Sequence, residues 1–373
     1  MLVEGVMKRE LRALRIASLV ATLLAAEALV GCAARIHVPF VPGDALAGPT
    51  LARSAPSEFE YINSLPHPAS VITAEDAAYR TVSLAFSSAG ENGQAGNLVT
   101  ARYYRSKSKG AKPLVIVLPI WGIETYPSNT ISAGLRKHGA GTINVLQIDG
   151  ERPLLDWDAV GDTRTEGEFL KLLDQMIGRF VSTVIDIRRV VDWAQTQPDV
   201  DPQRIALIGF SMGALVASVA MANEPRLAAG VLVMGGADPD DILAACSNEI
   251  GRGRGHLLEH LDWSLDEFRH ALAKPLARIN PARFAGMVDP RKVLIIEAAA
   301  DTCIPPAARE RLWQAMGRPE RLAYLYDHRT AFLAMTFLGG NNLQQQIYRF
   351  LDSRFPDAPR GGTLPEHMVQ DVG

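Results

Sequence analysis

The sequence predicts an α/β fold: a mainly parallel central sheet with helices on both of its faces. Short runs of apolar, largely β-branched residues recur along the chain, as expected of strands buried on both faces of a sheet. Segments with apolar residues at helical spacing lie between these runs, and strands that alternate with helices form parallel sheets. Of the 373 residues, 47% are hydrophobic, which is enough for a large buried core.

The predicted elements follow one another regularly from residue 79 onward. A pair of strands at 79–86 and 97–104, separated by a turn-rich stretch, comes first. Buried strands are then predicted at 113–118, 143–148, 204–210, 230–234, 293–298 and 322–326. Helices are predicted at 130–137, 169–194, 215–222, 307–316 and 342–354. The domain is expected to span 71–355 and to be followed by a polar tail at 356–373.

The alternation breaks between residues 238 and 290. About fifty residues there carry helical segments and a glycine–arginine stretch at 251–255, which is expected to be flexible. An insertion of that size between two strands of a sheet usually covers the active face. We therefore expect a helical cap or lid.

The N-terminus has the pattern of a secretory signal. Residues 8–15 hold four basic residues, and a short apolar run at 16–26 follows, which is shorter than the ~20 residues of a membrane span. The sequence Leu29-Val30-Gly31-Cys32 resembles the lipobox of bacterial lipoproteins. That resemblance implies a signal peptide at 1–32, a lipid on Cys32 and an envelope location. An uncleaved signal anchor or a plain signal peptide with a chance cysteine is the alternative.

Residues 33–70 are rich in proline and are predicted to be a tether between membrane and domain, either free or partly packed on the domain. The formal net charge is −3 and no basic stripe is present, so a nucleic-acid partner is not expected. Two cysteines follow Cys32, namely Cys246 and Cys303. They could pair in an oxidising compartment or remain two buried thiols, and their spacing does not decide between these.

The strongest chemical signal is Gly209-Phe210-Ser211-Met212-Gly213, which matches Gly-x-Ser-x-Gly. It lies between a predicted buried strand and a predicted helix. A sharp turn there would expose the serine hydroxyl at the carboxyl end of the sheet, on the positive N-terminus of the next helix. The glycines are expected because a Cβ at either place would clash with the opposing strand and helix. Ser211 is therefore the candidate nucleophile.

The segment 201–214 around this motif resembles the nucleophile segment of dienelactone-hydrolase-like and serine-esterase-like α/β-hydrolases. The order of elements from about residue 113 to 355 is also similar to that family. The resemblance implies an α/β-hydrolase fold and a triad in the chain order serine, acid, histidine.

Asp301 is the candidate acid, because it follows the strand at 293–298 and precedes an aliphatic residue and a proline, as in the family. It could instead cap the helix that starts near Pro306. A rival acid is Asp238, which follows the preceding strand and occupies the place of the acid in some relatives.

His328 is the candidate base, because it directly follows the last predicted strand and lies C-terminal to Asp301. The family often has a glycine before this histidine, whereas Asp327 stands here. An acidic neighbour could raise the pKa of the imidazole. The alternative is a solvated surface histidine.

An oxyanion hole needs two backbone N–H groups. The first should come from Met212, directly after the nucleophile. The second should come from the segment Leu118-Pro119-Ile120-Trp121-Gly122, which replaces the His-Gly-Gly type of segment, with Trp121 as first choice and Ile120 as the alternative. The absence of His-Gly argues against close kinship with enzymes of the hormone-sensitive-lipase type.

Together these residues predict a serine hydrolase that cleaves an ester or related acyl bond of a small-molecule substrate through an acyl-enzyme. No cofactor or metal is expected. One alternative is an inactive envelope lipoprotein that keeps the fold as a binding or scaffold module. A remote alternative is a zinc metalloprotease, because His256, Glu259 and His260 match the pattern His-x-x-Glu-His.

Overall fold

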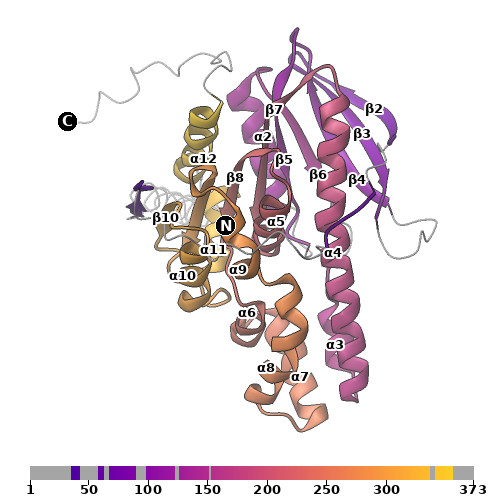
Figure 1. Ribbon diagram of the computed structural model, residues 1–373, viewed down its shortest axis with the longest axis vertical. Helices are drawn as coiled ribbons and strands as arrows, with labels where there is room; N and C mark the ends of the chain where they lie inside the picture. Colours follow the sequence, from indigo (N-terminus) through magenta and orange to yellow (C-terminus); the bar gives the residue numbers. More distant parts are fainter. Residues whose placement is uncertain are drawn as a thin grey trace, which may run out of the picture.

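The computed structural model describes residues 35–42, 58–62, 67–89, 98–121, 126–150, 153–336 and 341–355. In this part of the chain a 10-stranded sheet has the order β1-β10-β9-β8-β7-β5-β6-β4-β3-β2 (Figure 1). The strands are β1 (Arg35–Val38), β2 (Ala69–Glu75), β3 (Tyr79–Ser87), β4 (Leu98–Ser106), β5 (Lys112–Val117), β6 (Asn144–Ile148), β7 (Val200–Phe210), β8 (Leu227–Val233), β9 (Val293–Ala298) and β10 (Glu320–Tyr324).

The middle of the sheet is parallel and its two edges are antiparallel. Neighbouring strands run parallel from β6 through β5, β7, β8 and β9 to β10, whereas β4, β3 and β2 form an antiparallel extension on one side. β1 pairs antiparallel with β10 on the other side. The predicted fold class, a mainly parallel sheet between helices, is confirmed.

Helices cover both faces of the sheet, because its strands are apolar on both sides. On one face α4 (Glu166–Thr196), α5 (Met212–Asn223) and α10 (Pro306–Ala315) pack against the sheet. On the other face lie α2 (Tyr126–Gly139), α11 (His328–Thr336) and α12 (Asn341–Arg354). α5 is buried along nearly its whole length, from Gly213 to Ala222, so the helix that follows the predicted nucleophile is fixed at the centre of the molecule.

The insertion between β8 and β9, which we call the cap, is helical, as predicted, whereas its covering of the active face stays a prediction. It contains α6 (Pro239–Ala245), α7 (Glu249–Leu261), α8 (Leu265–Leu276), η2 (Ala277–Ile279), α9 (Pro281–Phe284), η3 (Ala285–Met287) and η4 (Pro290–Lys292). Together with α3 (Trp157–Asp162), helices α6, α7 and α8 form the lower end of the molecule in Figure 1, and the long helix α4 reaches from the sheet into this end.

The glycine–arginine stretch at 251–255 is not a flexible loop, which corrects that expectation. It lies within α7, and Gly253 allows α7 to approach α3 closely. A Cβ at Gly253 would lie 2.3 Å from the carbonyl oxygen of Trp157. The glycine is therefore used for helix packing.

Part of the proline-rich stretch at 33–70 belongs to the domain. β1 extends the sheet, and the side chain of Phe59 is fully buried, with its ring in an edge-to-face contact with Phe284 at 5.3 Å. Part of the predicted tether thus packs on the domain, and the role of the remaining residues stays a prediction. Cys32 and the tail at 356–373 lie outside the described residues. No helix of the described chain is long and apolar enough to span a membrane.

Candidate active site

Ser211 lies at a sharp turn between β7 and α5. Its backbone has φ 51° and ψ −118°, a conformation that non-glycine residues rarely adopt and that costs backbone strain. Its N–H donates to the carbonyl of Val233 on the neighbouring strand at 2.8 Å, which fixes the turn to the carboxyl end of the sheet. Met212 is the first residue of α5, where backbone N–H groups have no partner within the helix.

The two glycines that flank this turn are required by close backbone contacts. A Cβ at Gly209 would lie 2.1 Å from the carbonyl oxygen of Gly213, and a Cβ at Gly213 would lie 2.4 Å from the carbonyl oxygen of Pro119. Both distances are far inside van der Waals contact, and both partners are backbone atoms. The expectation that the glycines permit the turn is therefore supported by the geometry.

Asp301 lies in the acid loop, which we define as residues 299–305 between β9 and α10. Its side chain is fully buried. One carboxylate oxygen, Oδ1, accepts the N–H groups of Cys303 at 2.8 Å and Ile304 at 2.9 Å. These bonds orient the carboxylate, and they leave Oδ2 free to accept from His328.

His328 bridges the acid and the nucleophile. Its Nδ1 lies 2.7 Å from Oδ2 of Asp301, and its Nε2 lies 3.0 Å from Oγ of Ser211. Phe332 contacts the imidazole edge-on, with ring centroids 5.2 Å apart. The structure thus brings together three side chains that are up to 117 residues apart in the sequence, in the arrangement of a serine, histidine and aspartate relay.

His328 was predicted to follow the last strand directly, whereas β10 ends at Tyr324 and His328 begins α11. Asp327 precedes that helix, and its carboxylate accepts the N–H groups of Arg329 and Thr330, each at 2.9 Å. These backbone hydrogen bonds, first that of Thr330, hold the pKa of Asp327 below its usual range. The acidic residue in place of the family's glycine therefore acts as a helix cap.

Asp238, the rival acid, lies away from the relay. Its carboxylate accepts a hydrogen bond from Nδ2 of Asn280 at 2.8 Å and lies 3.4 Å from Nε of Arg311. Its backbone is left-handed, with φ 54°. Asp238 therefore organises the start of the cap, and Asp301 is the residue that contacts His328.

The predicted oxyanion segment passes directly beside the turn at Ser211. Pro119 contacts Gly213 through its carbonyl oxygen, and Trp121 has a left-handed backbone with φ 49°. A tryptophan in that region is strained, and such strain concentrates at functional sites. Residues 122–125 lie outside the described chain, and both Trp121 and Ile120 are half-buried.

Two features that hold the acid loop were not assigned from the sequence. Cys246, which directly follows α6, forms a disulfide with Cys303, so the pairing that the sequence left open is present. Arg309 of α10 donates from Nη1 to the carbonyl of Ala298 at 2.6 Å and from Nη2 to that of Ala299 at 3.3 Å. The disulfide therefore links the cap to the acid loop, and the buried Arg309 holds the start of that loop.

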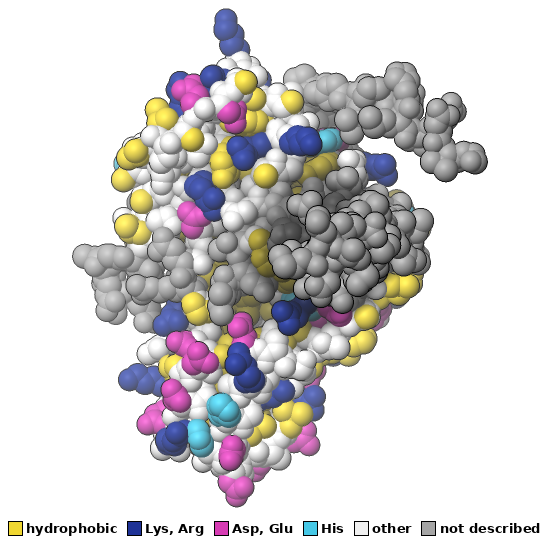
Figure 2. Space-filling model, turned by 180° about the vertical axis from the view of Figure 1, so that it is seen from behind, with side chains coloured by type: hydrophobic (Ala, Val, Ile, Leu, Met, Phe, Trp, Pro, Cys, Tyr) yellow, Lys and Arg dark blue, Asp and Glu magenta, His cyan; other side chains and the backbone are white. Residues whose placement is uncertain are grey.

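The residues of the metalloprotease alternative, His256, Glu259 and His260, lie on α7. Nη1 of Arg164 lies 2.8 Å from Nε2 of His260, a contact that disfavours a cation at that nitrogen. Figure 2 shows acidic, basic and histidine side chains interspersed over this lower end of the molecule, as on a solvated surface. In the described chain no group of three or more His, Cys, Asp or Glu residues could hold a metal. The structure gives this alternative no support.

The sequence matches a family model described as "Alpha/beta hydrolase family" over residues 126–369, which is more than half of the chain. Two uncharacterized proteins of Mycobacterium tuberculosis, from strains CDC 1551 / Oshkosh and ATCC 25618 / H37Rv, are each 30% identical over 161 residues. That match covers 42% of this chain and 35% of the length of each relative.

Solved structures show the same fold at low sequence identity. Acetyl xylan esterase 1 from Thermoanaerobacterium sp. JW/SL YS485 is similar with a TM-score of 0.54 and 18% identity, covering 78% of this chain and 88% of that one. Acetyl xylan esterase from Paenibacillus sp. R4 has a TM-score of 0.54 and 17% identity, covering 77% and 88%. Acylaminoacyl peptidase from Pyrococcus horikoshii has a TM-score of 0.52 and 12% identity, covering 78% and 44%.

Proposed function

The chain belongs to the alpha/beta hydrolase family, and we propose that it is an esterase-type enzyme that cleaves ester or related acyl bonds through an acyl-enzyme on Ser211. The observation that carries the proposal is the continuous contact from Oγ of Ser211 to Nε2 of His328, and from Nδ1 of His328 to Asp301. An inactive scaffold would have no need to maintain all three groups in this alignment.

The residues have distinct roles in the proposed reaction. His328 takes the proton of Ser211 while Oγ attacks the carbonyl carbon of the substrate, and the resulting imidazolium donates to the buried carboxylate of Asp301. The imidazolium then protonates the leaving group, and an acyl-enzyme remains on Oγ. His328 next takes a proton from water, the hydroxide attacks the acyl carbon, and the proton returns to Oγ as the acid leaves.

The developing oxyanion needs two N–H donors that do not have to reorganise. We assign the N–H of Met212, at the N-terminus of α5, as the first donor. The second is the N–H of Trp121, with Ile120 as the alternative, because this segment contacts the turn at Gly213. In either case the helix N-terminus adds a favourable field for negative charge.

The experiment is a kinetic comparison on p-nitrophenyl esters of increasing acyl length. Acetate is the first ester to assay, since acetyl xylan esterases share the fold. Ser211→Ala should lower kcat/KM at least about 10³-fold, and Asp301→Asn about 10³- to 10⁴-fold, with unchanged thermal unfolding. Asp238→Asn is the matched control and should keep most of the activity. Turnover by Ser211→Ala close to that of the wild type would reject the mechanism.

We also propose that the protein is held at the bacterial envelope by a lipid on Cys32. The sequence pattern 29–32 carries this proposal, and the disulfide between Cys246 and Cys303 supports an oxidising compartment. Metabolic labelling with an alkyne fatty acid tests it. Label should appear on the wild type and be lost in Cys32→Ser, whereas label retained by that variant would exclude Cys32 as the acylated residue.

A further inference from the structure

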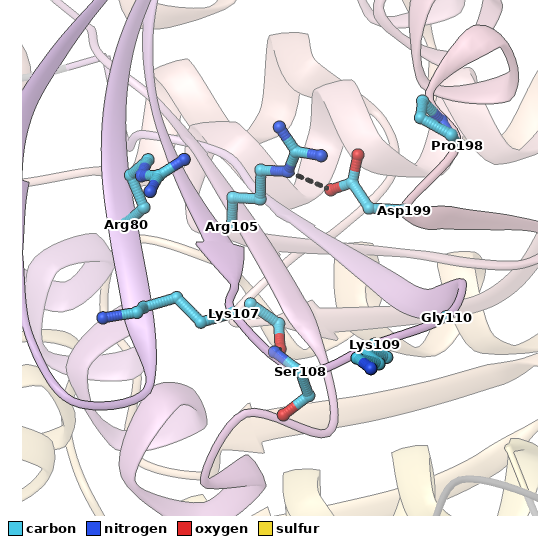
Figure 3. Close-up of a pocket in the computed structure, with 9 residues that line it drawn as sticks. Arg80, Arg105, Lys107, Ser108, Lys109, Gly110, Pro198 and Asp199 are labelled. Atoms are coloured by element: carbon cyan, nitrogen blue, oxygen red, sulfur yellow. Dashed lines mark hydrogen bonds and ion pairs between the residues drawn. The ribbon is translucent and has the colours of Figure 1, made fainter.

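A cationic hollow lies at the end of the sheet where the parallel strands β5 and β7 begin. The candidate active site lies at the opposite end, where β7 ends. It has a volume of about 430 Å³ and is lined by residues of β3 and β4, the loop at 107–110, and Pro198 and Asp199 before β7 (Figure 3). Asp199 precedes β7 and Ser211 follows it, and the irregular start of β7 at 200–205 advances by only two residues of the neighbouring β5, so the two places are on the order of 30 Å apart. The hollow is thus separate from the triad.

The wall of the hollow contains two arginines that face each other across a strand pair. Arg80 of β3 and Arg105 of β4 are register partners in the antiparallel ladder, so their side chains leave the same face with Cα atoms on the order of 5 Å apart. Like charges at directly opposed positions destabilise a sheet. Such an unfavourable pair of like charges is expected in a protein where a function requires both residues.

The other charges around the hollow leave an excess of positive charge. Lys107 and Lys109 complete a set of four cationic side chains in the lining, against one carboxylate, Asp199. Asp199 already accepts from the hydroxyl of Tyr103 at 2.5 Å and lies 3.1 Å from Nε of Arg105. This carboxylate therefore fixes Arg105 in place, as the dashed line in Figure 3 shows.

Arg80 is less completely paired than Arg105. Its closest carboxylate, Glu75, lies 3.4 Å from Nη2 and also lies 3.0 Å from Nζ of Lys107, so two cations share one anion. Nε of Arg80 is buried and has no hydrogen-bond acceptor. Lys109 has no ion pair with a carboxylate in the described chain. The protein as a whole carries a formal net charge of −3, so this concentration of cations is local.

We propose that this hollow binds a phosphate group, held between the guanidinium groups of Arg80 and Arg105 with Lys109 at the rim. Guanidinium forks match the oxygen spacing of phosphate, and a negatively charged phosphate group between the two arginines offsets the repulsion between them. The group can belong to a free phosphate or to an anionic lipid headgroup, because the recognised chemistry is the same. This binding does not depend on the hydrolase activity.

Calorimetric titration of the full-length protein with inorganic phosphate at constant ionic strength tests the proposal. The wild type should bind one phosphate saturably, and Arg80→Gln and Lys109→Gln should each weaken binding, Arg80→Gln by roughly tenfold or more. Lys274→Gln, which removes an exposed positive charge from α8 in the cap, should leave binding unchanged. Circular dichroism melts show whether each variant is folded.

Flotation with vesicles separates the two sources of the phosphate group. Binding to phosphatidylglycerol vesicles that exceeds binding to phosphatidylcholine vesicles and is lost in Arg80→Gln assigns the site to a lipid headgroup. Phosphate binding without such a difference assigns it to a soluble phosphate. Absence of saturable phosphate binding by the wild type together with absence of an Arg80-dependent vesicle interaction overturns the proposal. Equal phosphate affinity of folded Arg80→Gln, Lys109→Gln and Lys274→Gln overturns it as well.

Discussion

The nucleophile and the acid of the candidate triad are held in place by different means. At Ser211 the backbone itself fixes the turn, because Gly209 and Gly213 allow contacts that no side chain would permit. At Asp301 the acid loop is held by longer-range links, namely the disulfide from Cys303 to the cap and the hydrogen bonds from Arg309. The nucleophile thus depends on steric fit within a rigid core, whereas the acid depends on cross-links that can be removed individually.

The largest effect is expected from adding one methyl group at the turn. Gly209→Ala places a Cβ 2.1 Å from a backbone carbonyl, so either the turn or the start of α5 must move. We expect loss of soluble folded protein or destabilisation of more than about 4 kcal/mol, measured by denaturant unfolding.

The matched control is Gly255→Ala. Nothing lies within 4 Å of a Cβ at that position in α7, and alanine is the better helix former by roughly 0.5–1 kcal/mol. This variant should be as stable as the wild type or more so. A Gly209→Ala protein with normal stability would contradict the claim that steric fit fixes the nucleophile.

Removing the disulfide is expected to have an intermediate effect. The double variant Cys246→Ser/Cys303→Ser should lose about 2–4 kcal/mol of unfolding free energy. Because Cys303 also donates its N–H to Asp301, loosening this loop should lower kcat about ten- to a hundredfold and change KM little.

Reduction of the wild type with dithiothreitol should reproduce this loss of kcat and should not affect the double variant. Thiol quantification after denaturation shows whether reduction was complete. If the reduced protein and the double variant both keep the wild-type kcat, the acid loop does not need the cross-link to position Asp301.

The smallest effect is expected at Asp327. Asp327→Ala removes the cap of α11 and should cost about 1 kcal/mol of stability at pH 7. The pKa of this carboxyl is lowered, so its contribution is complete above the ordinary aspartate pKa and is lost as the pH falls through the lowered value. Thermal melts should therefore differ between variant and wild type at neutral pH and converge in acid. A difference in melting temperature that grows in acid would exclude this helix-capping role of Asp327.

These differences also explain what the sequence could and could not predict. Ser211 was assigned because its motif is local and its two glycines serve a steric need within five residues. Asp301 and His328 were assigned because each follows a predicted strand, and the order of strands is easy to recognise in the sequence of an α/β protein. The family assignment that this order suggested is confirmed, whereas the lipid anchor stays a prediction.

Features that depend on contacts between residues far apart in the sequence could not be predicted from the residues around them. β1 joins β10 across nearly the whole chain, so a proline-rich stretch gave no sign of a strand there. Gly253 serves a contact with Trp157 and has the same appearance in the sequence as a glycine in a flexible loop. By contrast, the helix-capping role of Asp327 at the start of α11 could have been predicted, because Asp327 and Thr330 have the three-residue spacing of polar residues at a helix N-terminus.

Covalent labelling with a fluorophosphonate probe, followed by peptide mass spectrometry, shows whether Ser211 is an activated nucleophile. The reagent requires a serine that its base has activated, so we expect one stoichiometric adduct, on Ser211. The adduct should be absent in Ser211→Ala and strongly reduced in His328→Ala, both of which should remain folded. Absence of an adduct on Ser211 in the folded wild-type protein, or labelling of folded His328→Ala as complete as that of the wild type, would exclude activation of Ser211 by His328.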